Sequence, residues 1–340
     1  MKVIVDDKIP YIKDFISQLA DQVVFLPGAS ITSTDVEDAD ALIIRTRTQC
    51  NSTLLANSRV RFIATATIGF DHIDTEYCQQ NHITWVNCPG CNAKSVAQYV
   101  HSALLALQEE KGIEYKNQCM GIVGVGHVGS LICETARSLG MKILRCDPPR
   151  AALGETGFVS LEEIAHKCQI ISFHTPLIKE EPYCTYHMAD QTFFQSLVHK
   201  PIIINTSRGE VIETQALLTA LKKRLISEAI IDVWEHEPLI DLNLLEQTFI
   251  GTPHIAGYSA DGKANATRMV LEAFCHFFNI PFNKFEIKLP SIDINQTEYR
   301  PNELKLALYD PRNDSKNLKI CPMQFESLRS NYPLRREKIG

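Results

Sequence analysis

Three polar segments of this 340-residue chain each follow a short apolar run, and together they contain an arginine, several carboxylates and two histidines. The segments are residues 205–209, 232–238 and 252–257. If the apolar runs are strands of an open α/β sheet, these segments lie outside the carboxyl ends of the strands, where such sheets bind ligands. A guanidinium can bind a carboxylate in two places, and an imidazole oriented by an acid can accept a hydroxyl proton. These segments therefore predict hydride transfer from a hydroxy acid.

A glycine-rich segment has the spacing G-x-G-x-x-G at Gly124, Gly126 and Gly129. It follows a predicted strand at residues 120–123 and precedes a predicted helix at residues 130–139. In a dinucleotide-binding turn the first glycine permits the tight bend, the second lets the backbone approach a pyrophosphate, and the third lets the helix pack closely. The start of the helix offers N–H groups and partial positive charge to the phosphates. The segment therefore predicts a dinucleotide site.

The acid that this fingerprint requires about 20 residues further on is Asp147, which ends the predicted strand 142–146. Its carboxylate would accept hydrogen bonds from the ribose hydroxyls and repel a 2′-phosphate. This favours NAD over NADP. The nearby cations Arg145 and Arg150 weaken that preference.

The elements that must position these residues alternate between strand and helix. Apolar runs predict one parallel sheet, and the spacing over residues 11–19 predicts a helix beside it. A later set of runs predicts a second doubly wound sheet. The runs are 3–5, 41–44, 62–65 and 83–86 in the first sheet, and 120–125, 142–146, 170–173, 202–205 and 229–233 in the second. A helix from Val96 to Leu107, with Ser95 as its plausible N-cap, lies between the two sets and can bridge two domains.

Composition excludes several other classes of protein. Hydrophobic residues make up 45% and charged residues 22% of the chain, which argues against a disordered, collagen-like or coiled-coil protein. The net charge of −6 makes nucleic acid an unexpected partner. No apolar run approaches the ~18 residues that a membrane span needs. The opening residues lack the features of a signal peptide, so we expect a cytoplasmic protein.

The eleven cysteines are scattered, and we expect most of them to be buried and reduced. Cys88 and Cys91 have CxxC spacing, but no second such pair supplies further zinc ligands. A redox role for this pair is left open. No histidine pair has metal-ligand spacing with a supporting acid, so we predict no metal.

Over residues 1 to about 285 the chain resembles the D-isomer-specific 2-hydroxyacid dehydrogenases. The resemblance lies in residues 124–129, 147, 174–177, 205–209, 232–238 and 254–257. It implies an NAD-dependent enzyme whose catalytic residues are Arg208, Glu237 and His254. It also implies an α/β protein in which a Rossmann domain, residues 96–256, is inserted into a flavodoxin-like substrate domain, residues 1–95 and 257–285.

Carried over by position, the resemblance also assigns binding residues. Substrate contacts fall on Thr46, Thr67 and Tyr258. Besides the three glycines, the cofactor contacts are His127, Val128, Asp147, Thr175, Thr206, Ser207, Arg208, Asp232 and Gly257.

Further motifs, at residues 65–67, 89–93, 146–150 and 331–337, narrow the resemblance to a member of the family that oxidises a phosphorylated hydroxy acid. Arg45 and Arg47, after the predicted strand 41–44, are candidates for holding the phosphate, and Arg335 or Arg336 could add charge from the tail. The narrower resemblance implies that residues 286–340 form a small α+β dimerisation domain of a homodimer. The chain ends earlier than this resemblance implies, so we expect that domain to be abbreviated.

Two alternative functions remain open. One is a dehydrogenase of the same superfamily that acts on 3-phosphoglycerate or glyoxylate, which the tail motifs disfavour. The other is a non-catalytic NAD-sensing protein of the same fold. The tail motifs, and the lack of basic or disordered regulatory segments, favour an enzyme.

Overall fold

The structure is a computed structural model that describes residues 1–292, 294 and 296–338, and it divides into two compact units. The first unit is Met1–Asn92 with Ser259–Ser291, and the second is Ala93–Tyr258 with the described residues from Ile292 onward. The first two junctions lie three and two residues from those expected from the sequence, and the last lies six residues beyond the expected one. The residues after Ile292 group with the second unit rather than forming a third.

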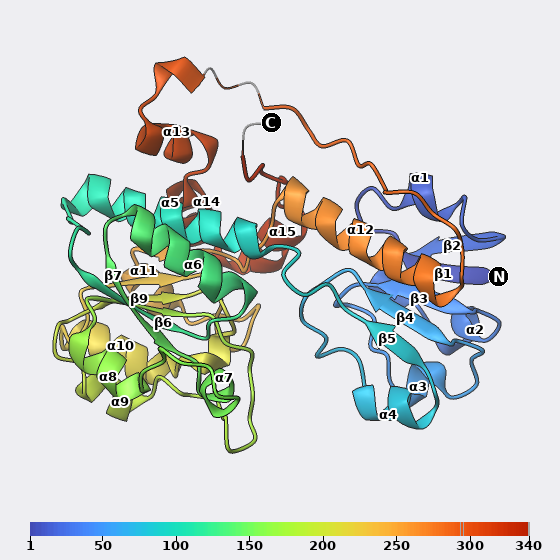
Figure 1. The fold of residues 1–340 in the computed structure, drawn as a ribbon, viewed down its shortest axis with the longest axis horizontal. Coiled ribbons are helices and arrows are strands. Elements are labelled where there is room, and N and C mark those ends of the chain that lie inside the picture. Colours follow the sequence, from blue (N-terminus) through green and yellow to red (C-terminus); the bar gives the residue numbers. More distant parts are fainter. Residues whose placement is uncertain (293, 295, 339–340) are drawn as a thin grey trace. The chain divides into compact units, whose positions relative to one another are not determined.

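The first unit is built on a five-stranded parallel sheet in the order β2-β1-β3-β4-β5 (Figure 1). The strands are β1 (Lys2–Asp6), β2 (Gln22–Leu26), β3 (Ala41–Ile44), β4 (Phe62–Thr65) and β5 (Thr84–Val86). This is the flavodoxin-like order, as the resemblance implied. The runs at β1, β3, β4 and β5 were predicted. The edge strand β2 was not predicted, although residues 23–26 form an apolar run, and in the sheet it is only partly buried.

Helices cover both faces of this first sheet. One face carries α1 (Lys13–Ile16) and the long α12 (Ala260–Phe277). The other face carries α2 (Ser33–Val36), α3 (Ser52–Leu55) and α4 (Thr75–Gln80). The short η1 (Gly28–Ser30) follows β2. Helix α12 returns to this unit after the second one and packs Phe274 against Phe62 of β4. Helix α1 begins later than predicted because Tyr11 has φ 64°, in the left-handed region, and it also ends three residues before the predicted end.

The second unit has a six-stranded, all-parallel sheet in the order β11-β10-β9-β8-β6-β7. The strands are β6 (Cys119–Val123), β7 (Lys142–Cys146), β8 (Ile170–Phe173), β9 (Ile202–Asn205), β10 (Glu228–Ile231) and β11 (Ile250–Gly251). The chain leaves β6 toward β7 on one side and then continues through β8 on the other. The carboxyl ends of β6 and β8 therefore form the switch point at which doubly wound sheets bind nucleotides.

Two layers of helices bury this second sheet. The first layer consists of α5 (Ala93–Lys111) and α6 (His127–Ser138). The second layer consists of α8 (Leu161–Lys167), α9 (Gln191–Gln195), α10 (Thr214–Lys222) and α11 (Leu242–Gln247). The short α7 (Pro148–Ala152) and η2 (Gly209–Val211) follow β7 and β9. The prediction that Ser95 caps α5 is wrong. The helix begins two residues earlier, and the buried Ser95 hydroxyl donates to Glu337 Oε1 at 2.7 Å.

The described part of the tail is helical and closes one edge of the second sheet. Its elements are η3 (Gln296–Glu298), α13 (Pro301–Leu308), α14 (Pro311–Ile320), η4 (Pro322–Gln324) and α15 (Phe325–Ser330). Gly251 N of the edge strand β11 donates to Ser315 Oγ at 3.0 Å, and Leu318 and Phe325 lie in the core. Residues 301–338 are called the C-terminal segment below. No strand is found among its described residues, which form helices and loops apart from an isolated β-bridge at Arg335.

Within the described part of the chain, no helix combines the length and apolar character needed to cross a membrane.

Candidate active site

The glycine turn after β6 has the shape that a pyrophosphate requires. Gly124 has φ 83°, and a Cβ atom there would lie 2.6 Å from His174 O. At Gly129 a Cβ atom would lie 2.1 Å from Gly124 O, so only glycine lets α6 start this close to the turn. At Gly126 a Cβ atom would meet no described atom within 4 Å. The backbone there borders open space next to the first N–H groups of α6, which begins at the exposed His127 followed by Val128.

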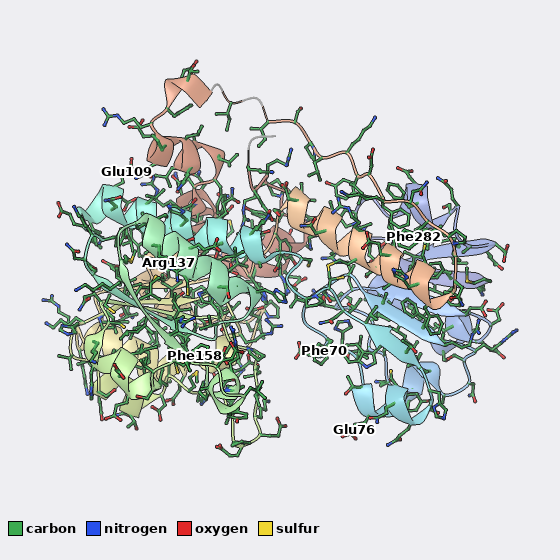
Figure 2. All side chains as sticks on the ribbon, in the orientation of Figure 1. Phe70, Glu76, Glu109, Arg137, Phe158 and Phe282 are labelled. Carbon is green, nitrogen blue, oxygen red and sulfur yellow. The ribbon has the colours of Figure 1, made fainter. Side chains whose placement is uncertain are left out.

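Asp147 lies directly beside this turn. Its Oδ2 accepts a hydrogen bond from Val125 N at 2.8 Å, and its Oδ1 accepts one from Arg150 N at 3.2 Å. Arg150 also lies at this turn, because its guanidinium donates to Val125 O while its Nε donates to Glu155 Oε1 at 2.9 Å. The guanidinium carbons of Arg145 and Arg150 lie 5.1 and 5.4 Å from the ring centre of Phe158, a side chain labelled in Figure 2. The carboxylate of Asp147 favours NAD over NADP, and the Arg150 cation beside it weakens that preference.

Two neighbours at the end of β8 differ in how their polar atoms are used. The His174 ring is within hydrogen-bond distance of Ser172 Oγ (2.8 Å) and Thr206 Oγ1 (3.2 Å), and burial lowers the pKa of this histidine to about 3. A neutral His174 therefore positions Thr206. Thr175 Oγ1 is buried and has no hydrogen-bond partner among the described residues. A buried hydroxyl without a partner at the switch point fits a site that a nucleotide completes.

The loop after β9 is organised by Asn205. Its Oδ1 accepts from both Ser207 N (3.0 Å) and Ser207 Oγ (2.7 Å), and its Nδ2 donates to Arg208 O at 3.0 Å. A Cβ atom on Gly209 would lie 2.0 Å from the Trp234 backbone. The loop that carries Arg208 therefore packs, backbone against backbone, on the loop that follows β10.

Asp232, at the end of β10, holds the next loop. Its Oδ1 accepts from Thr252 Oγ1 at 2.6 Å and Ile255 N at 2.8 Å, and its Oδ2 accepts from Ala256 N at 2.9 Å. Burial raises the pKa of Asp232, against the effect of the nearby His254 and of these hydrogen bonds. The carboxylate thus fixes the main chain on the carboxyl side of His254.

The central feature is a hydrogen-bonded pair. Glu237 Oε2 lies 2.8 Å from His254 Nδ1, and Glu237 Oε1 accepts from Trp234 N at 2.9 Å. Burial alone would raise the pKa of Glu237, but the adjacent His254 and these hydrogen bonds hold it below its usual value. An ionised carboxylate at Nδ1 fixes the tautomer in which Nε2 is the basic nitrogen. The exposed His236, with its own positive φ, is not part of this pair.

The predicted site residues are thus divided between the two units. The second unit holds Arg208, Glu237, His254 and Tyr258, together with every predicted cofactor contact. The first unit holds the remaining predicted substrate contacts, Thr46, Thr67, Arg45 and Arg47.

In the first unit, these residues follow β3 and β4. Thr67 Oγ1 donates to Gly69 O at 2.9 Å and lies 2.6 Å from Thr65 Oγ1. Arg45 Nη1 donates to Lys8 O at 3.3 Å, while its Nε is buried with no partner among the described residues. Arg45 therefore retains a donor for a ligand, and Thr46 and Arg47 are exposed.

Two arginines of the C-terminal segment contact the site, and sequence reasoning did not find this role for them. Arg329 Nη1 lies 3.8 Å from Glu237 Oε2. Arg335 donates to Ile255 O at 3.1 Å and to Ala256 O at 2.6 Å. In the structure the guanidinium of Arg335, one of the two arginines suggested to add charge from the tail, is bonded to main-chain carbonyl groups rather than open to a ligand. The only signal in the sequence was the Arg335-Arg336 pair within the tail motif.

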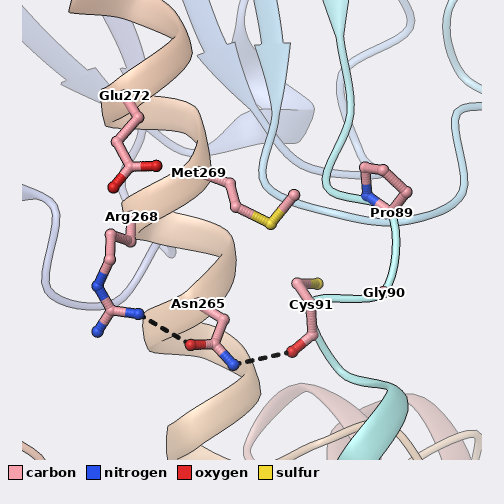
Figure 3. Close-up of a pocket in the computed structure, with 7 residues that line it drawn as sticks. All are labelled: Pro89, Gly90, Cys91, Asn265, Arg268, Met269 and Glu272. Carbon is pink, nitrogen blue, oxygen red and sulfur yellow. Dashed lines mark hydrogen bonds between the residues drawn. The ribbon is translucent and has the colours of Figure 1, made fainter. Parts of the chain in front are cut away.

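An open hollow of about 220 Å³ lies in the first unit, between residues 89–91 and α12 (Figure 3). Arg268 Nη1 there donates to Asn265 Oδ1 at 2.9 Å, and Asn265 Nδ2 donates to Cys91 O at 3.2 Å. No predicted site residue lines it. Next to it, burial raises the pKa of the Cys88 thiol, which opposes a reactive thiolate at this position. No group of three or more metal-ligating side chains gathers among the described residues.

Known proteins resemble this chain in sequence and in fold. The profile of the family described as "D-isomer specific 2-hydroxyacid dehydrogenase, NAD binding domain" matches residues 92–256. The chain is 58% identical to the erythronate-4-phosphate dehydrogenase of Bacteroides fragilis, over 99% of this chain and 97% of that one. It is 42% identical to the enzyme of the same name from Porphyromonas gingivalis, over 99% of this chain and 94% of that one.

Solved structures show the same fold. An NAD-bound 3-phosphoglycerate dehydrogenase from Entamoeba histolytica superposes with a TM-score of 0.69 at 27% identity, covering 85% of this chain and 99% of that one. A D-lactate dehydrogenase from Aquifex aeolicus, complexed with NAD and lactic acid, gives a TM-score of 0.67 at 22% identity, covering 82% and 96% of the two chains.

Proposed function

The chain belongs to the D-isomer-specific 2-hydroxyacid dehydrogenase family, and we propose that it oxidises 4-phospho-D-erythronate to 2-oxo-3-hydroxy-4-phosphobutanoate with NAD, in the biosynthesis of pyridoxal 5′-phosphate. The observation that carries the reaction is the Glu237–His254 pair at 2.8 Å, beside the loop of Arg208. The choice of substrate is supported by 58% identity, over nearly the whole chain, to an enzyme of that name.

The residues around the glycine turn fit NAD. The open space at Gly126 leaves room for the pyrophosphate, and Thr175 Oγ1 is a buried hydroxyl that still needs a partner. In the proposal the amides at His127 and Val128 bind the phosphates, and Asp147 binds the ribose. Thr206, Ser207, Arg208, Asp232 and Gly257 line the nicotinamide end. When bound, NAD supplies the acceptor for the hydride that leaves C2 of the substrate.

The side chains of the second unit perform the proton chemistry. The Arg208 guanidinium binds the substrate carboxylate and so orients the C2–H bond. His254 Nε2 accepts the proton of the C2 hydroxyl as the C–H electron pair leaves as hydride and the carbonyl forms. Glu237 accepts a hydrogen bond from the Nδ1–H group of His254 throughout the reaction and stabilises the imidazolium that results.

The far end of the substrate is assigned to groups with matching charge and hydrogen-bonding capacity. Tyr258, Thr46 and Thr67 contribute hydroxyl groups, and Arg45 and Arg47 carry the positive charge that a phosphate requires. The buried Nε of Arg45 supports this assignment, because it has no partner among the described residues.

We also propose that the protein acts as a cytoplasmic homodimer. All eleven cysteines are free, which fits a reducing compartment. The C-terminal segment presents Ile320 and Met323 at 66% and 83% exposure, and such apolar side chains suit a subunit interface. Light scattering of the wild-type protein and of an Ile320→Glu, Met323→Glu variant tests the dimer, which the double substitution should dissociate.

The function is tested by NADH formation with 4-phosphoerythronate and, separately, with 3-phosphoglycerate. We expect turnover with the first substrate and a much lower kcat/KM with the second. The reverse preference would assign a different substrate, and no turnover of either together with tight NAD binding would favour a non-catalytic NAD-sensing protein. His254→Ala should retain NAD binding and lose kcat by orders of magnitude. Activity near that of the wild type would remove His254 from the mechanism.

A further inference from the structure

We propose that the C-terminal segment completes the active centre of its own chain, with Arg329 positioning the Glu237–His254 pair and Arg335 holding the main chain that follows His254. The inference rests on the proposed function, in which that pair moves the substrate proton. Both arginines are positioning residues, because they act through other protein groups rather than by touching substrate or cofactor.

Arg329, on α15, is placed to act on the carboxylate of the pair. Its Nη1 lies 3.8 Å from Glu237 Oε2, the same oxygen that faces His254 Nδ1. Its guanidinium also hydrogen-bonds the side chain of Tyr258, a proposed substrate contact. The nearby cation favours the ionised form of Glu237 and limits where the carboxylate can turn. Arg329 thus connects the proton-accepting pair to the substrate side of the site.

Arg335 acts on the loop itself. Its guanidinium donates to Ile255 O, Ala256 O and Ser95 O, and its Nε donates to Gln98 Oε1 at 3.0 Å. The N–H groups of the same two loop residues, Ile255 and Ala256, donate to Asp232. The peptide groups after His254 are therefore held on their N–H side by Asp232 and on their C=O side by Arg335. Such a constraint preserves the geometry that proton transfer needs.

The choice of arginine fits the surroundings. The guanidinium carbon of Arg335 lies 4.0 Å from the Tyr309 ring centre, and a planar fork can serve several carbonyl groups at once where a lysine cannot. Tyr309 and Tyr332 both donate to Asp314 Oδ2 at 3.0 Å, which fastens the segment around the arginine. Enclosing a cation is unfavourable unless it is paired and hydrogen-bonded. Here the hydrogen bonds come from Ser95 and Gln98 of α5, from residues 255 and 256, and from Tyr332.

Arg329 is tested with Arg329→Gln, Arg329→Lys and a matched control, Arg300→Gln, an exposed arginine immediately before the C-terminal segment whose ion-pair partner is Glu303. We expect the glutamine variant to lower kcat about 10- to 100-fold with little change in the KM for NAD. The acid limb of its pH profile should move to higher pH. The lysine variant should restore the position of that limb, because it keeps the charge, and the control should match the wild type.

The direction of the pH shift follows from the charges that face the pair. His254 and Arg329 face Glu237, Tyr258 faces Arg329, and Asp232 faces His254. Removing the Arg329 cation makes Glu237 easier to protonate, so the ionised carboxylate persists only at higher pH. A purely structural role for Arg329 would lower activity at every pH and leave the limb in place.

Arg335 is tested with Arg335→Lys and, as a milder change, Gln98→Leu, which removes the acceptor of Arg335 Nε and the Gln98 Nε2 donor to Arg336 O but leaves the arginine. The measurement is hydrogen exchange of residues 252–258, which needs no substrate. We expect exchange to be about tenfold faster in Arg335→Lys and intermediate in Gln98→Leu. If the lysine variant does not fold, the Gln98→Leu result alone decides the point.

The outcomes separate this inference from the proposed function. If the wild type does not turn over 4-phosphoerythronate, the proposed function fails, and hydrogen exchange of residues 252–258 in the Arg329 and Arg335 variants still decides the inference. The inference would be overturned if the hydrogen-exchange rates of residues 252–258 and the acid limb of the pH profile equalled those of the Arg300→Gln control. A change in only one of the two arginine variants would overturn the role of the other arginine.

Discussion

Glu237→Gln removes the charge of the proposed orienting group while preserving its shape. The wild-type carboxylate accepts from two partners, Trp234 N at 2.9 Å and His254 Nδ1 at 2.8 Å. A glutamine offers one oxygen and one NH₂ group in the same place. If the oxygen stays on Trp234 N, the NH₂ group faces His254 and forces the tautomer with a proton on Nε2. That tautomer cannot accept the substrate proton.

The cost follows from the alternatives open to the variant. Turning the amide so that its oxygen faces His254 restores the reactive tautomer but leaves Trp234 N–H opposite an NH₂ group, at about 1–3 kcal/mol. The charge-assisted hydrogen bond to the ring is lost as well, at about 1.5–3 kcal/mol. Together these amount to about 2.5–6 kcal/mol, which corresponds to a loss of roughly 10²- to 10⁴-fold in kcat.

The assay is NADH formation under saturating substrate, with NAD affinity measured separately by calorimetry. Glu235→Gln is the matched control, since Glu235 forms a similar pair with His187 at 2.7 Å and also accepts from Thr214 N at 2.7 Å. We expect the control to keep kcat within about threefold of the wild type and both variants to bind NAD normally. Equal losses in the two variants, or wild-type activity in Glu237→Gln, would refute the tautomer argument.

Three further predictions test other parts of the structure. Gly126→Ala should leave the melting temperature unchanged, because its Cβ atom meets no described atom within 4 Å, yet it should weaken NAD binding at least about tenfold. Gly129→Ala, whose Cβ atom would lie 2.1 Å from a carbonyl oxygen, should lose about 2 kcal/mol of stability or more. Equal melting temperatures in the two variants would contradict both expectations. The pKa of His174 is lowered from 6.5 to about 3, so the unfolded chain binds more protons and stability should fall by about 1.5 kcal/mol from pH 6.5 to about pH 5; His174→Asn should reduce that slope, as chemical denaturation at the two pH values will show. Arg45→Ala and Arg47→Ala should each raise the KM for 4-phosphoerythronate about tenfold or more with kcat little changed, and an unchanged KM in both would remove them from the phosphate site.

Most of the sheet architecture could be predicted because central parallel strands are buried on both faces. Continuous apolar runs such as those of β3, β4 and β9 can hardly be anything else when turn residues bound them. The edge strand β2 was missed although residues 23–26 form a similar run, and unlike these strands it is only partly buried. The start of α5 was misplaced because Ser95 looks like a cap, whereas in the folded chain its hydroxyl bonds Glu337, a residue 242 positions away.

The site was predictable to the extent that its geometry is local. The glycine turn, Asp147 and the loops after β9 and β10 each combine a strand end with a short polar motif, and the sheet places such ends together. The internal bonds of these loops were not predictable. Asp232 braces residues 255 and 256, and Asn205 braces Ser207, because of backbone paths that a sequence pattern does not show.

The tail marks the limit of sequence reasoning for a physical reason. Its helices have a mostly polar composition, so periodicity says little about what they cover, and Arg335 reaches Ser95 across 240 positions of the chain. Yet the same segment supplies Ser315 to the open edge of β11 and Arg335 to the loop that β11 leads into. At the edge of a parallel sheet, both the edge strand and the loop that follows it have backbone groups that need hydrogen-bond partners. A segment that covers that edge therefore lies within reach of the catalytic loop, so the stability of the second unit and the geometry of its proton-transfer pair depend on the same residues.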